Sequence, residues 1–419
     1  MSWHPKVPAP TPTILTLNAG SSSLKFALYE GRQDLPLVLR GTVSSLDENP
    51  RLKIIAGTGE RVRERSLGKG PIRIRTAAEI LAAEIRGVDR ADAVCAVGHR
   101  IVHGGREFTA PTILDKPMLE KLRALAPLAP IHLPQNLEIV EVAARLFPEA
   151  VQVGCFDTAF HASRPYEAKT YGLPRDLTVS GIQSYGFHGL SYVYMASLLR
   201  ERYGPASGGR VIVAHLGSGA SLCAMRDGKS IATTMGFSPL DGLVMSTRCG
   251  ALDPGVVLYL LQERGMPPED VSRLLYQESG LLGISGITGD MRQLLETDSS
   301  AARQAVDFFV YRAAREIGSL AAALGGLDTL VFTAGVGENS PKIRERIGRA
   351  AEWLGVRIDD DLNVVGNHAI GLSGSPVDVL VLPTDEELVV AREVLALLDT
   401  VGEHAVSPAA DTQGGECGE

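Results

Sequence analysis

The sequence predicts an α/β protein of two related halves, each with a mixed sheet flanked by helices. The chain of 419 residues is longer than one compact core usually allows. A strand–turn–strand pattern near its start recurs 197 residues later, so that Gly20 corresponds to Gly217. After each copy, strand-like and helix-like stretches alternate. These three observations indicate a duplicated fold.

The first copy of the pattern joins two apolar, strand-like runs through the turn 18–23. The turn holds Asn18, one glycine and three serines that include Ser21 and Ser23, and Lys25 starts the second run. Backbone N–H groups, hydroxyls and a cation on one side of a turn suit a polyphosphate. An ordinary hairpin turn is the alternative, because glycine and serine are common in turns.

The second copy has the same layout, and its turn consists of His215, Leu216, Gly217, Ser218 and Gly219. An acidic residue followed by glycine closes the hairpin in both copies. Chance matches of small residues are one interpretation. A duplication is the other, and it predicts two domains that each bring one phosphate-binding loop to a shared cleft.

Between and after the hairpins, the sequence pattern predicts further elements. In the first half these are a loop with an edge strand at 45–70, a helix at 76–86, a strand at 93–98, helices at 117–127 and 135–147, and a strand at 151–156. In the second half they are a hairpin region at 211–236, a helical tract at 254–325, a strand at 329–333, a Gly-rich turn at 334–339, a strand at 377–382 and a helix at 385–399.

Capping signals mark the last two helices. Ser340 and Pro341 suit the N-cap and the first position of a helix that follows the Gly-rich turn. Thr384 and Glu387 have the spacing of a capping box at the start of the final helix.

Composition excludes several classes of function. The net charge of −8 gives no support for binding to nucleic acid or to an anionic membrane. No apolar run approaches the roughly 20 residues that span a bilayer, so we expect no membrane partner. The Pro-rich segment 1–12 lacks the apolar core of a signal peptide, and we expect it and 402–419 to be flexible tails. Five scattered cysteines fit reduced thiols in a cytoplasmic protein.

Polar residues cluster just past the carboxyl ends of the expected strands. They are Asn18, Arg100, Asp157, His215, Gly335 and Glu386. Ligands of open α/β sheets bind in the crevice at that end, so these residues predict one site built from several loops. The segment 335–340 combines a close-approaching Gly-rich backbone with a helix start, which suits a nucleotide. A connection without a ligand is the alternative.

Arg100 and Arg248 both lie among glycines and small residues. The fixed fork of arginine donors suits carboxylate and phosphoryl oxygens, and a structural salt bridge is the alternative for each. His188 is either a neutral hydrogen-bond donor to a transferring phosphoryl group or a packed histidine. Asp157 and Glu386 suit Mg²⁺, which prefers one or two carboxylates with water and phosphate oxygens. Their alternatives are a strand-end cap and a partner of the helix dipole.

His99 and His103 are four residues apart, which invites comparison with zinc sites. No glutamate lies between them in the metalloprotease pattern, and the Gly-rich context argues against a helix. We therefore expect no zinc at these two residues.

Ten motifs in order resemble the acetokinase family, within the superfamily of actin, heat-shock chaperones and sugar kinases. They are NAGSSSLKF, GHRIVHGG, FDTAFH, YGFHG, HLGSGAS, MGFSPLDGL, STRCGALDP, SGLLGISGITGDMR, FTAGVGENS and PTDEEL, and the resemblance covers residue 13 to about 398. It implies two ribonuclease H-like domains of the actin-like ATPase type, 13–157 with 387–401 and 158–386. It also implies a homodimer.

The activity that the resemblance implies is reversible, direct in-line phosphoryl transfer from ATP to acetate, giving acetyl phosphate and ADP. Mg²⁺, with Mn²⁺ as an alternative, would assist. Propionate or butyrate as acceptor is one alternative. A non-metabolic, actin-like ATPase clamp is the other, and the lack of a substrate-binding domain disfavours it.

The resemblance also implies roles for individual residues. Asn18 and Glu386 would organise the metal, and Ser21, Ser23 and Lys25 would line the phosphate path. Arg100 would hold the carboxylate, with Asp157 as the essential acidic residue and His188 and Arg248 as transition-state stabilisers. The nucleotide would contact His215, Leu216, Gly217, Ser218, Gly219, Asp290, Met291, Arg292, Gly335, Val336, Gly337, Glu338 and Asn339. Val102, Ile131, Phe187 and Pro239 would surround the acyl methyl group.

The chain departs from the family pattern at several positions. Ser218 replaces the usual Asn, Ile131 replaces Leu, and Tyr192 stands where a second histidine is common. Leu133 and Gln135 replace Asn and Pro, and Asp385 replaces Asn. None of these changes removes a charged catalytic group, but the change at Ile131 affects the expected acyl pocket.

Overall fold

The computed structural model describes residues 12–20, 23–86 and 93–405. The first sheet contains β1 (Thr13–Ala19), β2 (Leu24–Glu30), β3 (Leu37–Ser44), β4 (Arg51–Ala56), β5 (Arg61–Ser66), β6 (Val94–Ile101), β7 (Thr112–Ile113) and β8 (Val151–Phe156). The second sheet contains β9 (Arg210–Leu216), β10 (Ala220–Arg226), β11 (Lys229–Thr233), β12 (Thr329–Thr333) and β13 (Asp378–Val381).

The helices of the first half are α1 (Ile74–Arg86), α2 (Lys116–Ala124) and α3 (Leu133–Leu146). The helices between the two sheets in sequence are α4 (Tyr166–Lys169), α5 (Arg175–Val179) and α6 (Gly189–Tyr203). Those of the second half are α7 (Pro254–Gln262), α8 (Pro268–Gln277), α9 (Gly280–Ser285), α10 (Met291–Glu296), α11 (Ser300–Leu324), α12 (Ala334–Asn339), α13 (Pro341–Ala350), α14 (Asp360–Val365) and α15 (Glu386–Ala405).

The two sheets share one topology, which confirms the duplicated α/β fold. The strand order is β5-β4-β3-β2-β1-β6-β8-β7 in the first sheet and β11-β10-β9-β12-β13 in the second. In each, an antiparallel meander, β1–β5 in the first sheet and β9–β11 in the second, precedes two parallel strands, β6 and β8 or β12 and β13. The first sheet carries β7 as a further antiparallel edge strand. β1 and β9 coincide under the 197-residue offset of the repeated sequence pattern.

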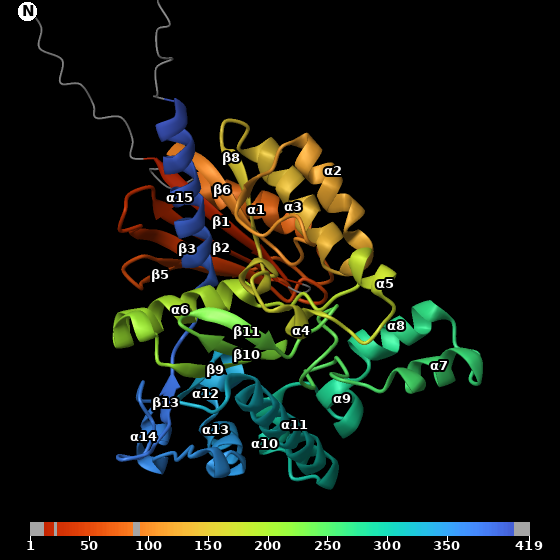
Figure 1. Ribbon diagram of the computed structural model, residues 1–419. Coiled ribbons are helices and arrows are strands. Elements are labelled where there is room, and N and C mark those ends of the chain that lie inside the picture. Colours follow the sequence, from red (N-terminus) through yellow and green to blue (C-terminus); the bar gives the residue numbers. More distant parts are fainter. Residues whose placement is uncertain (1–11, 21–22, 87–92, 406–419) are drawn as a thin grey trace, which may run out of the picture.

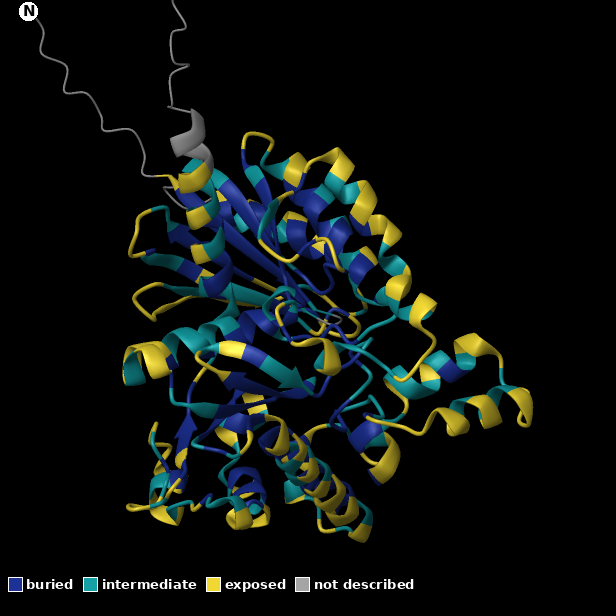
Figure 2. Cartoon of the chain, in the orientation of Figure 1, coloured by how far each residue is buried: buried dark blue, intermediate teal, exposed yellow. Residues whose placement is uncertain are grey.

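The elements form alternating layers (Figure 1). The apolar faces of α1 and α3 cover one side of the first sheet, and α15 covers the other. α6 packs against α15 and also covers one side of the second sheet, whose opposite side carries α11. Figure 2 shows both sheets largely buried, whereas α7 and α8 project with exposed surfaces. The last helix thus packs on the first sheet, and the domain bounds 13–157 with 387–401 stay a prediction.

Several boundaries differ from expectation. The Gly-rich segment 334–339 is the short helix α12 and not a turn, although Ser340 and Pro341 do occupy the N-cap and first positions of α13. α15 runs to Ala405, so the residues 402–405 belong to a helix and not to a tail. The rest of the two expected tails, apart from Pro12, lies outside the described residues.

The predicted capping box is also wrong. The Asp385 carboxylate accepts a hydrogen bond from the N–H of Leu388, which is the cap of α15. The Thr384 hydroxyl instead donates to the Ser191 hydroxyl. A further difference concerns the strands, since Asn18, Arg100 and His215 lie within the last residues of β1, β6 and β9 and not beyond them.

Candidate active site

Two adjoining cavities form the candidate site: the central one lies between the halves of the molecule, and the outer one lies within the second half. The central cavity, of about 490 Å³, is lined by Asn18, Gly20, Ser23, Lys25, Arg100, His188, His215, Gly217, Ser218, Gly219, Ala334, Gly335, Glu338, Thr384, Glu386 and Glu387. Twelve of these sixteen residues were predicted site residues. Both hairpin turns, the end of β6 and the start of α15 contribute, so the duplicated loops do converge.

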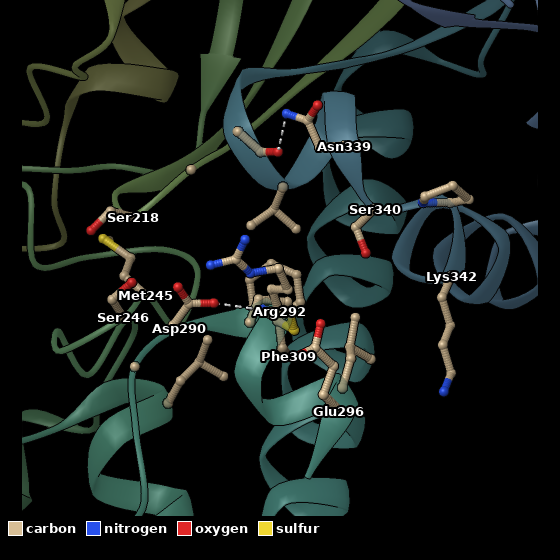
Figure 3. A pocket seen from close by; sticks show the side chains of 18 residues that line it. Ser218, Met245, Ser246, Asp290, Arg292, Glu296, Phe309, Asn339, Ser340 and Lys342 are labelled. Atoms are coloured by element: carbon tan, nitrogen blue, oxygen red, sulfur yellow. Dashed lines mark hydrogen bonds between the residues drawn. The ribbon is translucent and has the colours of Figure 1, made fainter. Parts of the chain in front are cut away.

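The outer cavity, of about 620 Å³, shares Gly217, Ser218 and Gly335 with the central one. Its further residues are Met245, Ser246, Leu281, Gly289, Asp290, Met291, Arg292, Leu295, Glu296, Phe309, Val336, Asn339, Ser340, Pro341 and Lys342. Figure 3 shows Ser218 and Ser246 on one side of this space and Ser340 and Lys342 on the other. Apolar walls with a few polar groups suit a nucleoside.

Hydrogen bonds at the starts of α10 and α12 hold two parts of the outer-cavity wall in place. Asp290 accepts hydrogen bonds from the N–H groups of Arg292 and Gln293, which holds the start of α10 against the cavity. Glu338 reaches back within α12 and accepts from the N–H of Ala334. This contact ties the second half of the Gly-rich segment to its first residue.

Two of the described residues predicted to contact the nucleotide, Leu216 and Gly337, do not line these cavities. The Leu216 side chain is fully buried in the hydrophobic core, so only its backbone can face a ligand. Gly337 is buried within α12, where its carbonyl accepts from Arg344. Ser21 lies outside the described residues. Met245, Ser246 and Phe309 line the outer cavity but were not predicted, since nothing in their local sequence marks them.

A network of charged side chains forms one wall of the central cavity. Arg100 donates to both carboxylate oxygens of Asp157, from Nε at 3.1 Å and from Nη2 at 2.5 Å. Its Nη1 donates to Asn18 Oδ1 at 3.1 Å. Asn18 Nδ2 donates in turn to Glu386 Oε2 at 3.1 Å. Both interpretations of Arg100 therefore hold in part, because it has a salt-bridge partner and also lines the cavity.

The pKa values of two acids in this network, Asp157 and Glu386, shift in opposite directions. Burial raises the pKa of Asp157 to about 6, although Arg100 pulls it down. Burial also disfavours charge on Glu386, but Arg100, His215 and Lys25 outweigh it and lower the pKa of Glu386. Glu386 therefore stays ionised at neutral pH, while Asp157 begins to take up a proton about one pH unit below 7.

Glu387 is an acid of the site that sequence reasoning missed. Its Oε1 accepts from Asn18 Nδ2 at 3.4 Å, and burial raises its pKa. Two consecutive glutamates at a helix start are typical of helix-dipole partners, so the local pattern gave no sign of a second role.

His188 and His215 stack in the centre of the site. Their ring centroids are 4.2 Å apart at an interplanar angle of 19°. His188 has a positive φ of 58°, and a Cβ built on Gly219 would lie 3.3 Å from its Nε2. Burial, together with the neighbouring histidine and Arg100, lowers the pKa of His188 well below 6.5, and burial lowers that of His215 to about 4. Both rings are neutral at pH 7.

Arg248 reaches the same place from the second half of the chain. Its Nη1 lies 3.8 Å from the Cβ position on Gly219 and donates to the Pro239 carbonyl at 3.3 Å. Its Nη2 is 3.4 Å from His132 Nε2. Within the described residues, no carboxylate lies within 4.0 Å of this guanidinium. A largely desolvated cation without a counter-ion suits an anionic ligand.

Two of the four expected acyl-pocket residues, Pro239 and Ile131, lie beside this arginine. Phe187 and Val102 are buried in one hydrophobic cluster. Pro239 is buried and its carbonyl accepts from Arg248, whereas Ile131 is half-buried and precedes His132, the other contact of Arg248. The structure therefore brings apolar side chains and a cation together, as an acyl carboxylate requires.

The site has the chemistry of a magnesium centre completed by a ligand. No group of three or more His, Cys, Asp or Glu side chains is arranged to hold a metal in residues 12–20, 23–86 and 93–405. The oxygens of Asn18, Glu386 and Glu387 face one cavity, and such hard donors fit Mg²⁺ that keeps water and phosphate oxygens as its other ligands. His99 Nε2 is hydrogen-bonded to Gln152, and His103 Nδ1 accepts from the N–H of Gly105.

The departures from the family pattern are accommodated in the site. Ser218 lines both cavities and Asp385 caps α15. Leu133 is buried at the first turn of α3. Tyr192 is fully buried and its hydroxyl is hydrogen-bonded to Ser221.

Two copies of one fold that enclose cations, carboxylates and a nucleoside-sized cavity define a phosphotransferase of the duplicated ribonuclease H-like class. The sequence matches the acetokinase family over residues 13–392, and the chain belongs to that family. It is 49% identical over 392 residues to "Acetate kinase" of Rhodopseudomonas palustris strain TIE-1, covering 92% of this chain and 98% of that protein. It is 46% identical over 396 residues to "Acetate kinase" of Methylocella silvestris, with the same two coverages.

Solved structures agree with the family. A propionate kinase from Francisella tularensis matches with a TM-score of 0.84 and 36% identity, covering 91% of this chain and 98% of that one. The acetate kinase of Porphyromonas gingivalis matches with a TM-score of 0.80 and 34% identity, covering 92% and 100%. Among the described residues, no helix is long and apolar enough to cross a membrane.

Proposed function

We propose that this protein transfers a phosphoryl group from ATP to acetate, reversibly, giving acetyl phosphate and ADP. The observation that carries the proposal is that cations of both halves of the chain approach the loop 217–219: Arg100 and Lys25 line the central cavity with this loop, and Arg248 lies beside Gly219. The relatives called acetate kinase, at up to 49% identity, support the choice of acetate.

The two cavities divide the work of binding. The outer cavity takes the nucleoside, and the phosphates extend past Gly217, Ser218 and Gly335 into the central cavity. A loose phosphoryl transition state is stabilised chiefly by positioning and positive charge. Arg248 and Lys25 supply charge from the second and first halves of the chain, so closure of the halves would complete the site.

The acceptor needs no general base. A carboxylate of ordinary pKa near 4 is already ionised at pH 7. Asp157 is bound on both oxygens by Arg100, which leaves it poorly placed to take a proton from a substrate. We propose that Asp157 positions Arg100, whose five N–H donors leave two for the acceptor carboxylate.

Asn18 and Glu386 would hold Mg²⁺ in the central cavity, with Mn²⁺ as a substitute. When bound, the ion would supply positive charge that neutralises the nucleotide phosphates. The lowered pKa of Glu386 keeps this carboxylate ionised and ready to bind the ion over the working pH range.

The preference for acetate, propionate or butyrate would depend on the four expected acyl-pocket residues. The structural match to a propionate kinase makes propionate the second candidate acceptor. One methylene in an apolar pocket changes kcat/KM by about 10–200-fold, so comparing acetate, propionate and butyrate separates the candidates.

Assembly and location also belong to this proposal. α7 exposes Val256, Leu258 and Tyr259 on one projecting helix, and an exposed apolar patch of this kind is typical of a subunit interface. We propose that the chain forms a homodimer through this region and acts in the cytoplasm. Sedimentation of the protein and of a Leu258→Glu variant tests the interface, since the variant should be monomeric.

The function is tested by incubating the purified protein with ATP, Mg²⁺ and acetate and trapping acetyl phosphate with hydroxylamine. We expect acetate- and ATP-dependent hydroxamate formation together with ADP release. ATP hydrolysis that acetate does not stimulate, with no hydroxamate from any of the three acids, would contradict the proposal.

A further inference from the structure

A buried hydrogen-bonded chain leads from Tyr192 to His188. The Tyr192 hydroxyl is 2.5 Å from Ser221 Oγ, and Ser221 Oγ is 2.8 Å from His188 Nδ1. Tyr192 and Ser221 are fully buried. Tyr192 belongs to α6 and Ser221 to β10, so both side chains are held by regular elements, and His188 is the residue directly before α6.

The direction of the protons in this chain follows from burial. A buried phenol O–H needs an acceptor, and Ser221 Oγ is the hydrogen-bond partner of Tyr192 in the described part of the structure. Burial raises the pKa of Tyr192 well above 10, so its proton is retained. Since Tyr192 donates to Ser221, the single proton of Ser221 is free to go to His188 Nδ1. If Ser221 donated to Tyr192, the Tyr192 proton would be buried without an acceptor. If Ser221 accepted from both Tyr192 and His188, its own proton would have no acceptor among the hydrogen bonds of the described residues.

His188 Nδ1 is therefore an acceptor, and the proton of the neutral ring is on Nε2. That nitrogen faces the phosphate-binding loop, because a Cβ on Gly219 would lie 3.3 Å from it. The same position is 3.8 Å from Arg248 Nη1, so two donors converge above Gly219. The absence of a side chain at residue 219 leaves that space open for a phosphoryl oxygen.

His215 repeats the arrangement one ring away. Its Nδ1 is 2.8 Å from Ser191 Oγ, which accepts a hydrogen bond from Thr384 Oγ1 at 3.0 Å. Nδ1 of each stacked histidine is thus hydrogen-bonded to a serine, and each serine is hydrogen-bonded to a second hydroxyl. If both neutral rings carry their proton on Nε2, both of these N–H groups face the loop 217–219.

We propose that Tyr192 and Ser221 are positioning residues that lock His188 in the tautomer protonated on Nε2, so that it donates to the transferring phosphoryl group. The inference rests on the proposed function, and it goes further by giving a role to the tyrosine that departs from the family pattern. A histidine at residue 192 would donate or accept equally well. The phenol, by contrast, has to donate, and this sets the direction of both hydrogen bonds, from Tyr192 to Ser221 and from Ser221 to His188.

The first test is the tautomer of His188 in the wild-type protein, from long-range ¹H–¹⁵N correlations of ¹⁵N-histidine-labelled protein. The His188 signal is identified by its loss in His188→Gln. We expect a protonated Nε2 and an unprotonated Nδ1. A proton on Nδ1 would overturn the proposal, and this measurement needs neither activity nor a Tyr192 variant.

The second test compares Tyr192→Phe with Tyr203→Phe. Tyr203 is a matched control, because its hydroxyl contacts Asp378 at the far end of α6. We expect Tyr192→Phe to lower kcat about fivefold to tenfold, the loss of about one oriented hydrogen bond, while the KM values change less than about twofold. Its His188 should show a mixture of tautomers, and Tyr203→Phe should match the wild type.

The outcomes separate the two proposals. If Tyr192→Phe keeps both the wild-type kcat and a single Nε2-protonated His188, the tyrosine has no positioning role. If the wild-type protein forms no acyl phosphate, the proposed function fails, while the tautomer measurement still decides how His188 is held. A parallel fall in kcat and in thermal stability, with the tautomer unchanged, would show a merely structural role.

Discussion

Replacement of Arg248 by alanine is expected to remove most of the activity without weakening the fold. The guanidinium contacts Pro239 and His132 at 3.3 and 3.4 Å and, among the described residues, has no carboxylate within 4.0 Å. Burial lowers the pKa of Arg248, and the charge of Arg100 lowers it further, so the folded state holds this cation at a cost.

The substitution has two expected effects, one on kcat and one on the free energy of unfolding. Loss of one donor positioned on a developing charge costs about 3–4 kcal/mol, or roughly 10²–10³ in kcat. Stability should change by no more than about 1 kcal/mol in either direction, because two weak hydrogen bonds are exchanged for relief of an unpaired buried charge. Initial rates of hydroxamate formation at saturating substrates and urea unfolding give the two quantities.

Arg164→Ala is the matched control, because Arg164 is a buried arginine with a structural role. It donates to the carbonyls of Ser184 and Tyr185 at 2.7 and 2.9 Å and to that of His161 at 3.1 Å. Its removal leaves these acceptors unpaired, so the free energy of unfolding should fall by at least about 3 kcal/mol. If Arg248→Ala is destabilised as much as this control, or keeps more than about a tenth of the wild-type kcat, the reasoning is refuted.

Three further predictions use other parts of the site. The rate should fall as the pH drops through about 6, the raised pKa of Asp157, and a limb near pH 4 would contradict this. Because the folded pKa lies above the unfolded one, protonation of Asp157 favours the folded state between about pH 6 and 4, so this loss should not coincide with acid unfolding. Gly219→Ala places a methyl group 3.3 Å from His188 Nε2, and we expect kcat to fall roughly 10²-fold with an unchanged melting temperature. Glu386→Gln, which keeps the shape beside Asn18 but removes the charge, should raise the half-saturating Mg²⁺ concentration about 10–100-fold.

Matched variants control the last two measurements. Gly172→Ala adds a methyl group where no atom lies within 4 Å, and it should leave kcat unchanged. Glu352→Gln removes an exposed charge outside both cavities and should leave the Mg²⁺ titration unchanged. An equal effect of either control and its partner variant would contradict the corresponding prediction.

The duplicated hairpins could be predicted because their signals are local. Apolar strands, a Gly/Ser turn and an acidic–glycine turn occur within each copy, and β1 and β9 lie where the repeat predicts them. β5 could not be predicted with the same confidence, since all its residues are exposed and its sequence shows no alternation. α6 was missed because it contacts α15, β8 and β9 on different sides, which leaves no clear polar face.

The residues of the candidate site also fall into those that could be predicted from sequence and those that could not. Motif residues such as Lys25 and Glu386 were found because their types suit phosphate and metal chemistry, and the structure brings them to one cavity. The outer-cavity residues Met245 and Phe309 were not found, because a residue that only lines a nucleoside cavity is indistinguishable in sequence from any core residue.

The sequence by itself determined the duplicated α/β fold, the family and most of the residues that line the central cavity, because turn chemistry and strand alternation act over a few neighbouring residues. Only the tertiary structure decided which of those groups neutralise one another. Arg100 pairs with Asp157, whereas Arg248 has no such partner among the described residues, and Tyr192 sets the proton on His188. Charge pairing and proton placement depend on distances of a few ångströms between segments far apart in the chain, and no local pattern encodes those distances.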